Sequence, residues 1–147
     1  MASLLTTEIK NQVRDVFTNI NKPVNILFFG QEENCPYCDD TRQLLEELVE
    51  LSDNLQLTVF DLDKDSTIAS QYNIDKAPGF VLAAQDGEEI VDFGIRFAGI
   101  PSGHEFSTLI HDVMQIASRD SGLNEKTRSY LKTLREPLHL QVFVTPT

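Results

Sequence analysis

Two cysteines, separated by two residues, constrain this chain more than any other feature. Cys35 and Cys38 are the only cysteines among its 147 residues. Residues 24–30, which precede them, contain a continuous apolar run that is typical of a buried strand. Residues 36–51, which include the second cysteine, have apolar side chains at helical spacing. The cysteine pair is therefore predicted to lie where a strand passes into a helix.

Length and composition favour one compact domain. The hydrophobic content of 41% is sufficient for a core, and low-complexity tracts are absent. Glu8 interrupts the first apolar residues too early for a signal peptide, and no apolar run approaches the roughly 20 residues that a membrane helix needs. We therefore expect a cytoplasmic protein without a membrane segment. In that compartment a cysteine pair is more often redox-active or metal-binding than part of a structural disulfide.

The net charge of -11 is concentrated around the cysteines. Residues 31–65 hold eleven acidic and two basic side chains, a sum of -9, whereas residues 1–30 sum to +1 and residues 66–147 to -3. A negative surface repels nucleic acid and anionic lipid, and it favours partners with basic patches. A solvated acidic face that serves only solubility is the alternative interpretation.

The helix after the cysteines has well-separated faces. Pro36 suits the first helical position, because its missing N–H needs no partner there, and this placement makes Cys35 the N-cap. The apolar face comprises Tyr37, Thr41, Leu44, Leu45, Leu48 and Leu51. The polar face comprises Asp39, Asp40, Gln43, Glu46, Glu47 and Glu50.

The remaining pattern predicts an α/β protein in which helices flank a central mixed sheet. Helices are expected within residues 4–20, from residue 66, and over residues 102–118, the last opened by Ser102 and Glu105 as a capping box. Strands are expected at residues 55–62 and 80–84, and a hairpin turn at Asp86-Gly87 leads to a strand at 89–93. Gly94 suggests a bulge.

The end of the chain resembles its beginning at an offset of 114 residues. Phe17 falls on Leu131, Pro23 on Pro137, and Phe29 on Phe143. A helix that starts at Asn124 and a strand over residues 138–144 are therefore expected to repeat the first helix and strand. From this repeat we expect a complete unit at residues 1–121 and the opening of a truncated second unit at residues 122–147.

The expected chemistry of the pair is thiol–disulfide exchange. A helix N-terminus favours a thiolate at Cys35, whereas the nearby carboxylates of Glu32, Glu33, Asp39 and Asp40 oppose it. We expect the helix to prevail, because exposed carboxylates are screened by salt. Cys35 is then the nucleophile that attacks a disulfide, and Cys38 resolves the mixed disulfide.

Two other roles for the pair are less favoured. A zinc site needs further ligands, and only His104, His111 and His139 are available, at spacings that fit no familiar zinc motif. A purely structural disulfide between Cys35 and Cys38 would close too small a loop to add much stability. We therefore expect no metal.

The motif Cys35-Pro36-Tyr37-Cys38 resembles the active site of glutaredoxins, and the order of elements resembles a thioredoxin fold. A closer resemblance is to the protein disulfide oxidoreductases of archaea and thermophilic bacteria, which contain two tandem thioredoxin-fold units. Residues 93–106 (FGIRFAGIPSGHEF) look like the first unit of that family, and residues 142–147 (VFVTPT) look like the strand that leads into its second CxxC.

The resemblance implies a site and a set of partners. Catalysis would use Cys35 and Cys38 with Pro36 and Tyr37 between them. Pro78 would follow a cis peptide bond opposite the cysteines, and the backbone of Ala77 would bind an extended substrate peptide. Protein disulfides would be the substrates and a thioredoxin-reductase-like flavoenzyme the electron donor, with no cofactor beyond the redox-active disulfide.

Two further functions stay open at this point. The motif also suits a glutathione-dependent glutaredoxin, although the acidic surroundings disfavour anionic glutathione. A docking role without catalysis, or a homodimer, is suggested by residues 138–144, which would form an apolar edge strand. Arg96 is interpreted as the partner of a local carboxylate, and His104 as a surface residue at a helix start.

Overall fold

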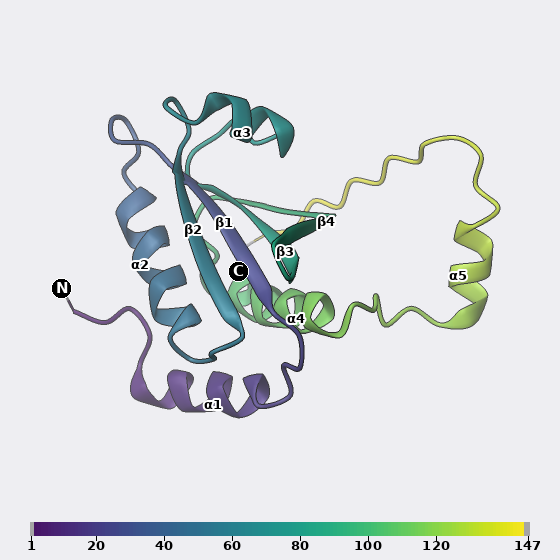
Figure 1. Ribbon diagram of the computed structural model, residues 1–147, viewed down its shortest axis with the longest axis horizontal. Helices are drawn as coiled ribbons and strands as arrows, with labels where there is room; N and C mark the ends of the chain where they lie inside the picture. Colours follow the sequence, from purple (N-terminus) through teal and green to yellow (C-terminus); the bar gives the residue numbers. More distant parts are fainter. Residues whose placement is uncertain (1, 146–147) are drawn as a thin grey trace.

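Helices flank a four-stranded mixed sheet in the computed structural model, which describes residues 2–145 (Figure 1). Residues 146–147, the end of the predicted second unit, lie outside the described residues. The strands are β1 (Val24–Gly30), β2 (Leu55–Asp61), β3 (Gly79–Asp86) and β4 (Glu89–Ala98). The helices are α1 (Thr7–Phe17), α2 (Cys38–Val49), α3 (Ser66–Gln71), α4 (His104–Ser118) and α5 (Glu125–Leu131). The predicted α/β class is confirmed.

The strand pairing brings four chain segments to one end of the sheet. The strand order is β2-β1-β3-β4; β1 runs parallel to β2 and antiparallel to β3, and β4 is antiparallel to β3. The register places Gly30 opposite Asp61, Phe29 opposite Gly79, and Gly79 opposite Ala98. The ends of β1, β2 and β4 therefore meet the start of β3 where the cysteine loop begins.

The two faces of the sheet are covered unequally. Side chains of α1, α2 and α4 form the larger core cluster with Ile26 and Phe28 of β1 and Leu82 of β3. The smaller cluster on the other face joins Leu27 and Phe29 to Ala69 of α3. Because both faces of β1 are covered, all seven of its residues are buried, which explains its continuous apolar run.

The predicted hairpin and bulge are both present, with the turn one residue later than expected. Asp86 pairs with Glu89, so Gly87 and Glu88 form the turn, and Gly87 has a φ of 65°. The register shifts between Leu82 and Ala83, which leaves extra residues in β4 around Gly94. The bulge lets β4 continue well beyond the predicted end at Phe93, to Ala98.

Two predicted helix starts are wrong. Helix α2 begins at Cys38 with Tyr37 as its N-cap, so Cys35 is not the N-cap and Pro36 is not the first helical residue. Instead, residues 35–38 form a preceding turn, in which the Cys38 N–H donates to the Cys35 carbonyl at 3.3 Å. Helix α4 begins at His104. Its N-cap is Gly103, with a φ of 60°, and not Ser102 as predicted.

The C-terminal segment departs most from its prediction. Helix α5 has no buried residues and lies apart from the sheet, whereas the chain after it turns back in the direction of the sheet (Figure 1). Residues 138–144 form no strand, and the exposed fractions of their large apolar side chains run from 63% at Leu138 to 90% at Phe143. A strand needs a partner for its backbone groups, and none lies beside this segment among residues 2–145. One feature of the repeat is retained: α1 ends at Phe17 and α5 at Leu131.

None of the helices described between residues 2 and 145 is both long and apolar enough to cross a membrane.

Candidate active site

The two cysteines form a disulfide at the end of β1. Their Cα atoms are 5.4 Å apart, and their side chains differ in exposure: Cys38 is 6% exposed and belongs to the main core, whereas Cys35 is half-buried at its edge. A Cβ atom at Gly30 would lie 2.9 Å from the Phe28 ring and 3.8 Å from the Cys38 sulfur. Glycine at the end of β1 therefore allows the strand to pass closely beside the disulfide.

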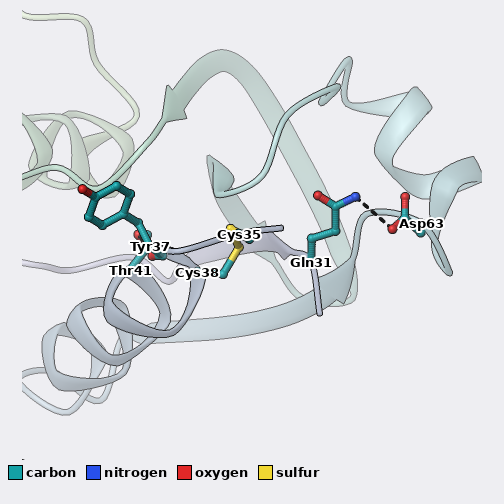
Figure 2. The surroundings of a disulfide bond; sticks show 6 residues. All are labelled: Gln31, Cys35, Tyr37, Cys38, Thr41 and Asp63. Carbon is teal, nitrogen blue, oxygen red and sulfur yellow. Dashed lines mark hydrogen bonds between the residues drawn. A yellow bond between two sulfur atoms is a disulfide. The ribbon is translucent and has the colours of Figure 1, made fainter. Parts of the chain in front are cut away.

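Residues between and after the cysteines hold the turn in place. The carbonyl oxygen of Tyr37 accepts two hydrogen bonds from Thr41, at 3.0 Å from its backbone N–H and at 2.6 Å from its hydroxyl. Thr41 is fully buried, whereas Pro36 is exposed and Tyr37 is 57% exposed. The Tyr37 ring points away from the disulfide (Figure 2). Pro36 and Tyr37 thus face solvent beside the more accessible cysteine.

An open cavity of about 530 Å³ lies against the disulfide. Both cysteines line it, together with Gly30 and residues from the loop after β1 and the turn after β2. These two segments are linked: Gln31 donates to the Asp63 carboxylate at 2.9 Å (Figure 2), and Lys64 pairs with Glu32. The cavity wall beside the disulfide is therefore built from connected loops.

The predicted proline lies at the same end of the sheet. The peptide bond between Ala77 and Pro78 is cis, and Gly79 directly follows at the start of β3, opposite Phe29. Pro78 is buried, and its carbonyl accepts a 2.8 Å hydrogen bond from the Gly99 N–H. Ala77 is half-buried and packs against the core cluster that Cys35 also contacts.

Arg96 and His104 take structural positions, as predicted. Arg96 donates to both carboxylate oxygens of Asp92, at 2.8 and 2.6 Å, and to the Tyr72 carbonyl at 2.7 Å. These bonds to Arg96 hold the pKa of Asp92 below its usual range, although burial opposes them. His104 is exposed at the start of α4. Within residues 2–145, no group of three or more His, Cys, Asp or Glu side chains is placed to hold a metal ion.

Glu47 is a buried charge that the sequence pattern assigned to the polar face of α2. It is 8% exposed, and its carboxylate accepts hydrogen bonds from the Ser3 hydroxyl at 2.5 Å and the Leu4 N–H at 2.8 Å. Lys10 of α1 pairs with it at 2.9 Å, and Gln43 donates at 2.9 Å. Burial raises the pKa of Glu47, but these donors together outweigh burial and hold the pKa far below its usual range.

The fold agrees with that of known redox proteins, although no family model matches the chain. A protein disulfide oxidoreductase from Aeropyrum pernix superposes with a TM-score of 0.76 and 25% identity over 88% of this chain and 55% of that chain. A thioredoxin from Trichomonas vaginalis, at 18% identity and a TM-score of 0.51, shares the fold alone. The chain thus has a thioredoxin fold that is similar to that of a disulfide oxidoreductase, with a CxxC disulfide whose second cysteine is the first residue of α2.

A more particular match is to the alkyl hydroperoxide reductase AhpF. The N-terminal domain of this protein from Enterococcus faecalis superposes with a TM-score of 0.75 and 26% identity over 85% of this chain and 58% of that chain. The alkyl hydroperoxide reductase AhpF of Staphylococcus epidermidis is 26% identical over 145 residues, and that of Staphylococcus aureus is 25% identical. The match covers 98% of this chain but 25% of these curated relatives, so the chain spans about a quarter of their length.

Proposed function

We propose that this chain catalyses dithiol–disulfide exchange with protein disulfides. The observation that carries the proposal is the unequal exposure of two bonded cysteines beside an open cavity: Cys35 is half-buried and Cys38 is 6% exposed. An incoming disulfide reaches the Cys35 sulfur more readily. Cys38 stays protected until it is needed for the second step.

The exchange proceeds in two steps. The Cys35 thiolate attacks one sulfur of the partner disulfide; a mixed disulfide forms, and the other partner sulfur leaves as a thiolate. The Cys38 thiolate then attacks the Cys35 sulfur, which restores the Cys35–Cys38 bond and releases the second partner thiolate. Two electrons pass from the domain to the partner, and the released thiolates take protons from water. The reverse sequence oxidises a partner dithiol.

The segment around Pro78 is the proposed binding site for the partner peptide. Among residues 2–145, neither the backbone N–H nor the carbonyl of Ala77 has a hydrogen-bond partner. Ala77 packs against the core cluster that Cys35 also contacts, and it precedes the start of β3 at the end of the sheet where the cysteine loop begins, so these groups are available to an extended peptide at that end. Pro36 and Tyr37, which are exposed next to Cys35 in the chain, would contact the same partner.

The proposed electron donor is a flavoenzyme of the thioredoxin-reductase type. The support comes from relatives that are themselves named as reductases, in which the matching stretch is about a quarter of the protein. Such an enzyme would pass two electrons to the Cys35–Cys38 disulfide. The cytoplasm and the division at residue 121 remain predictions.

Turnover of a protein disulfide tests the proposal directly. With dithiothreitol as reductant, the wild-type chain is expected to accelerate the reduction of insulin disulfides, measured by the turbidity of the released chains. Cys35→Ser nearly preserves side-chain volume but removes the attacking sulfur, so the acceleration should disappear. Retained acceleration by Cys35→Ser would contradict the assignment of Cys35 as nucleophile.

A docking role is a second candidate, because the apolar side chains of residues 138–144 are exposed. These residues alternate in the manner of a half-buried strand, with Leu138, Leu140, Val142 and Val144 on one side of an extended chain. Pairing with another chain would give their backbone groups partners and cover their side chains. This function is compatible with exchange at the disulfide.

A further inference from the structure

The cavity at the disulfide has more negative charge than the exchange chemistry requires. Its lining contains one cation, Arg42, and four carboxylates, those of Glu32, Asp39, Asp61 and Asp65. The Arg42 guanidinium is already paired with Glu46 at 2.7 Å. Cys35 and Cys38 line the same cavity, so a disulfide that reaches Cys35 enters this field.

Two of the carboxylates are fixed in place. One oxygen of Asp61 accepts from the N–H groups of Asp63 at 3.0 Å and Lys64 at 2.9 Å. One oxygen of Asp65 accepts from the Asp61 N–H at 2.8 Å. These side chains cannot turn away without loss of their bonds. Their negative charge is therefore a permanent part of the wall beside the disulfide.

The other two carboxylates differ in whether a basic side chain pairs with them. Glu32 is paired with Lys64, the basic residue of the turn after β2. Asp39 is exposed in the first turn of α2, directly after Cys38. Taken together, the lining carries a net charge of -3, from four carboxylates and one guanidinium. Charges of this kind act on a ligand over a Debye length of about 8 Å at physiological ionic strength.

We propose that these carboxylates make the site selective for disulfides flanked by cationic groups, such as the lysine or arginine side chains of a partner protein. This inference rests on the proposed function and names its substrate class. The disulfide is the reactive site, and the carboxylates decide which partners approach it. A cationic partner is concentrated at the cavity and an anionic one is depleted, and both effects weaken as salt is added.

Small disulfides that differ mainly in charge test the selectivity without a particular partner protein. The reduced chain would be mixed with cystamine (two ammonium groups), bis(hydroxyethyl) disulfide (neutral) or dithiodiglycolate (two carboxylates). Each electron pair passes from the Cys35 and Cys38 thiols to the small disulfide, which leaves as two thiols. Each rate is divided by the rate of free dithiothreitol with the same disulfide, which corrects for intrinsic reactivity.

The corrected rate for cystamine is expected to exceed that for dithiodiglycolate by roughly tenfold at low salt, the lower end of electrostatic steering effects. This ratio should shrink toward one when salt is raised. Equal corrected rates at low salt would overturn the charge selection while leaving the exchange chemistry intact. If the reduced chain reacted with none of the three disulfides, the result would contradict the proposed function and the charge selection with it.

A pair of double variants locates the effect. Glu32→Gln with Asp39→Asn removes two charges at the cavity, and Glu50→Gln with Asp53→Asn removes two charges beyond the C-terminal end of α2. The first pair is expected to lose most of the preference for cystamine, measured as the ratio of its corrected rate to that of the neutral disulfide, so that any change in the reactivity of Cys35 cancels. The second pair should keep the preference. An equal loss in both pairs would mean that only total charge matters, which would overturn the assignment to the cavity.

Discussion

The hydroxyl of Thr41 donates a 2.6 Å hydrogen bond to the carbonyl oxygen of Tyr37. The same oxygen also accepts from the Thr41 backbone N–H at 3.0 Å, and the Thr41 side chain is fully buried. This pair links the residue between the cysteines to the first turn of α2. The CxxC turn is thus stabilised from within the helix that follows it.

Replacement of Thr41 by valine is expected to lower the free energy of unfolding by about 1 kcal/mol, because a buried hydroxyl–carbonyl bond is lost while the shape is kept. Denaturant unfolding measures the change. Thr133→Val is the matched control: its hydroxyl donates to the Tyr130 carbonyl at 2.6 Å, but the site is exposed. Similar small decreases in the free energy of unfolding of both variants would show that the Thr41–Tyr37 hydrogen bond stabilises the fold no more than the exposed one does.

Replacement of Glu47 by glutamine is expected to destabilise the chain by about 2 kcal/mol, because charge-assisted bonds to Ser3, Leu4 and Lys10 are weakened or lost. Glu46→Gln is the neighbouring control, since the exposed Arg42–Glu46 pair contributes at most about 1 kcal/mol. Equal losses in the two variants would contradict the anchoring role of Glu47.

The same carboxylate should make stability depend on pH. Burial opposes ionisation, but the donors around Glu47 lower its pKa in the folded state below the value of about 4.3 expected in the unfolded chain. Its contribution is therefore fully present above pH 4.3 or so, and it is lost as the pH falls below that value. Unfolding free energies measured through this range should fall less steeply for Glu47→Gln than for wild type. Parallel curves would contradict this assignment.

A comparison of two electron donors distinguishes exchange with protein disulfides from a glutathione-dependent function. NADPH consumption is expected to be faster with a thioredoxin-reductase-type flavoenzyme than with glutathione and glutathione reductase, since glutathione is anionic and the cavity is acidic. Faster consumption in the glutathione arm would favour the glutaredoxin alternative. The Cys35→Ser variant serves as the blank in both arms.

Residues 138–144 are expected to mediate self-association. In sedimentation experiments the wild-type chain should show concentration-dependent association, because exposed apolar side chains gain by burial. Leu140→Lys with Val142→Lys should reduce it, whereas Tyr130→Lys, at an exposed site on α5, should not. A wild-type chain that stays monomeric at every concentration would contradict the prediction.

Much of the fold follows from local sequence signals. The strand at residues 24–30 was predicted with its observed bounds, because a strand covered on both faces is apolar along its whole length. The bulge at Gly94 and the proline-preceded β3 were likewise predictable, since glycine and proline restrict local geometry in known ways. The CxxC spacing placed the disulfide correctly.

Other features depended on distant contacts. The pattern of α2 assigned Glu47 to solvent, but residues 3–5 pass over it and supply donors that no local pattern reveals. The start of α2 was placed too early, because the turn at Cys35 satisfies the same backbone groups as a helix would. Residues 138–144 pair with no strand among residues 2–145, so their apolar alternation alone did not make them a strand.

The order of attack is the central claim, and trapping of the mixed disulfide tests it most directly. Each reduced variant would be incubated with bis(hydroxyethyl) disulfide, and the added mass would be followed by intact mass spectrometry. Cys38→Ser is expected to form a stable mixed disulfide at Cys35, whereas Cys35→Ser should react much more slowly, because the Cys38 sulfur is buried in the core. Capture by Cys35→Ser at the same rate or faster would contradict the account.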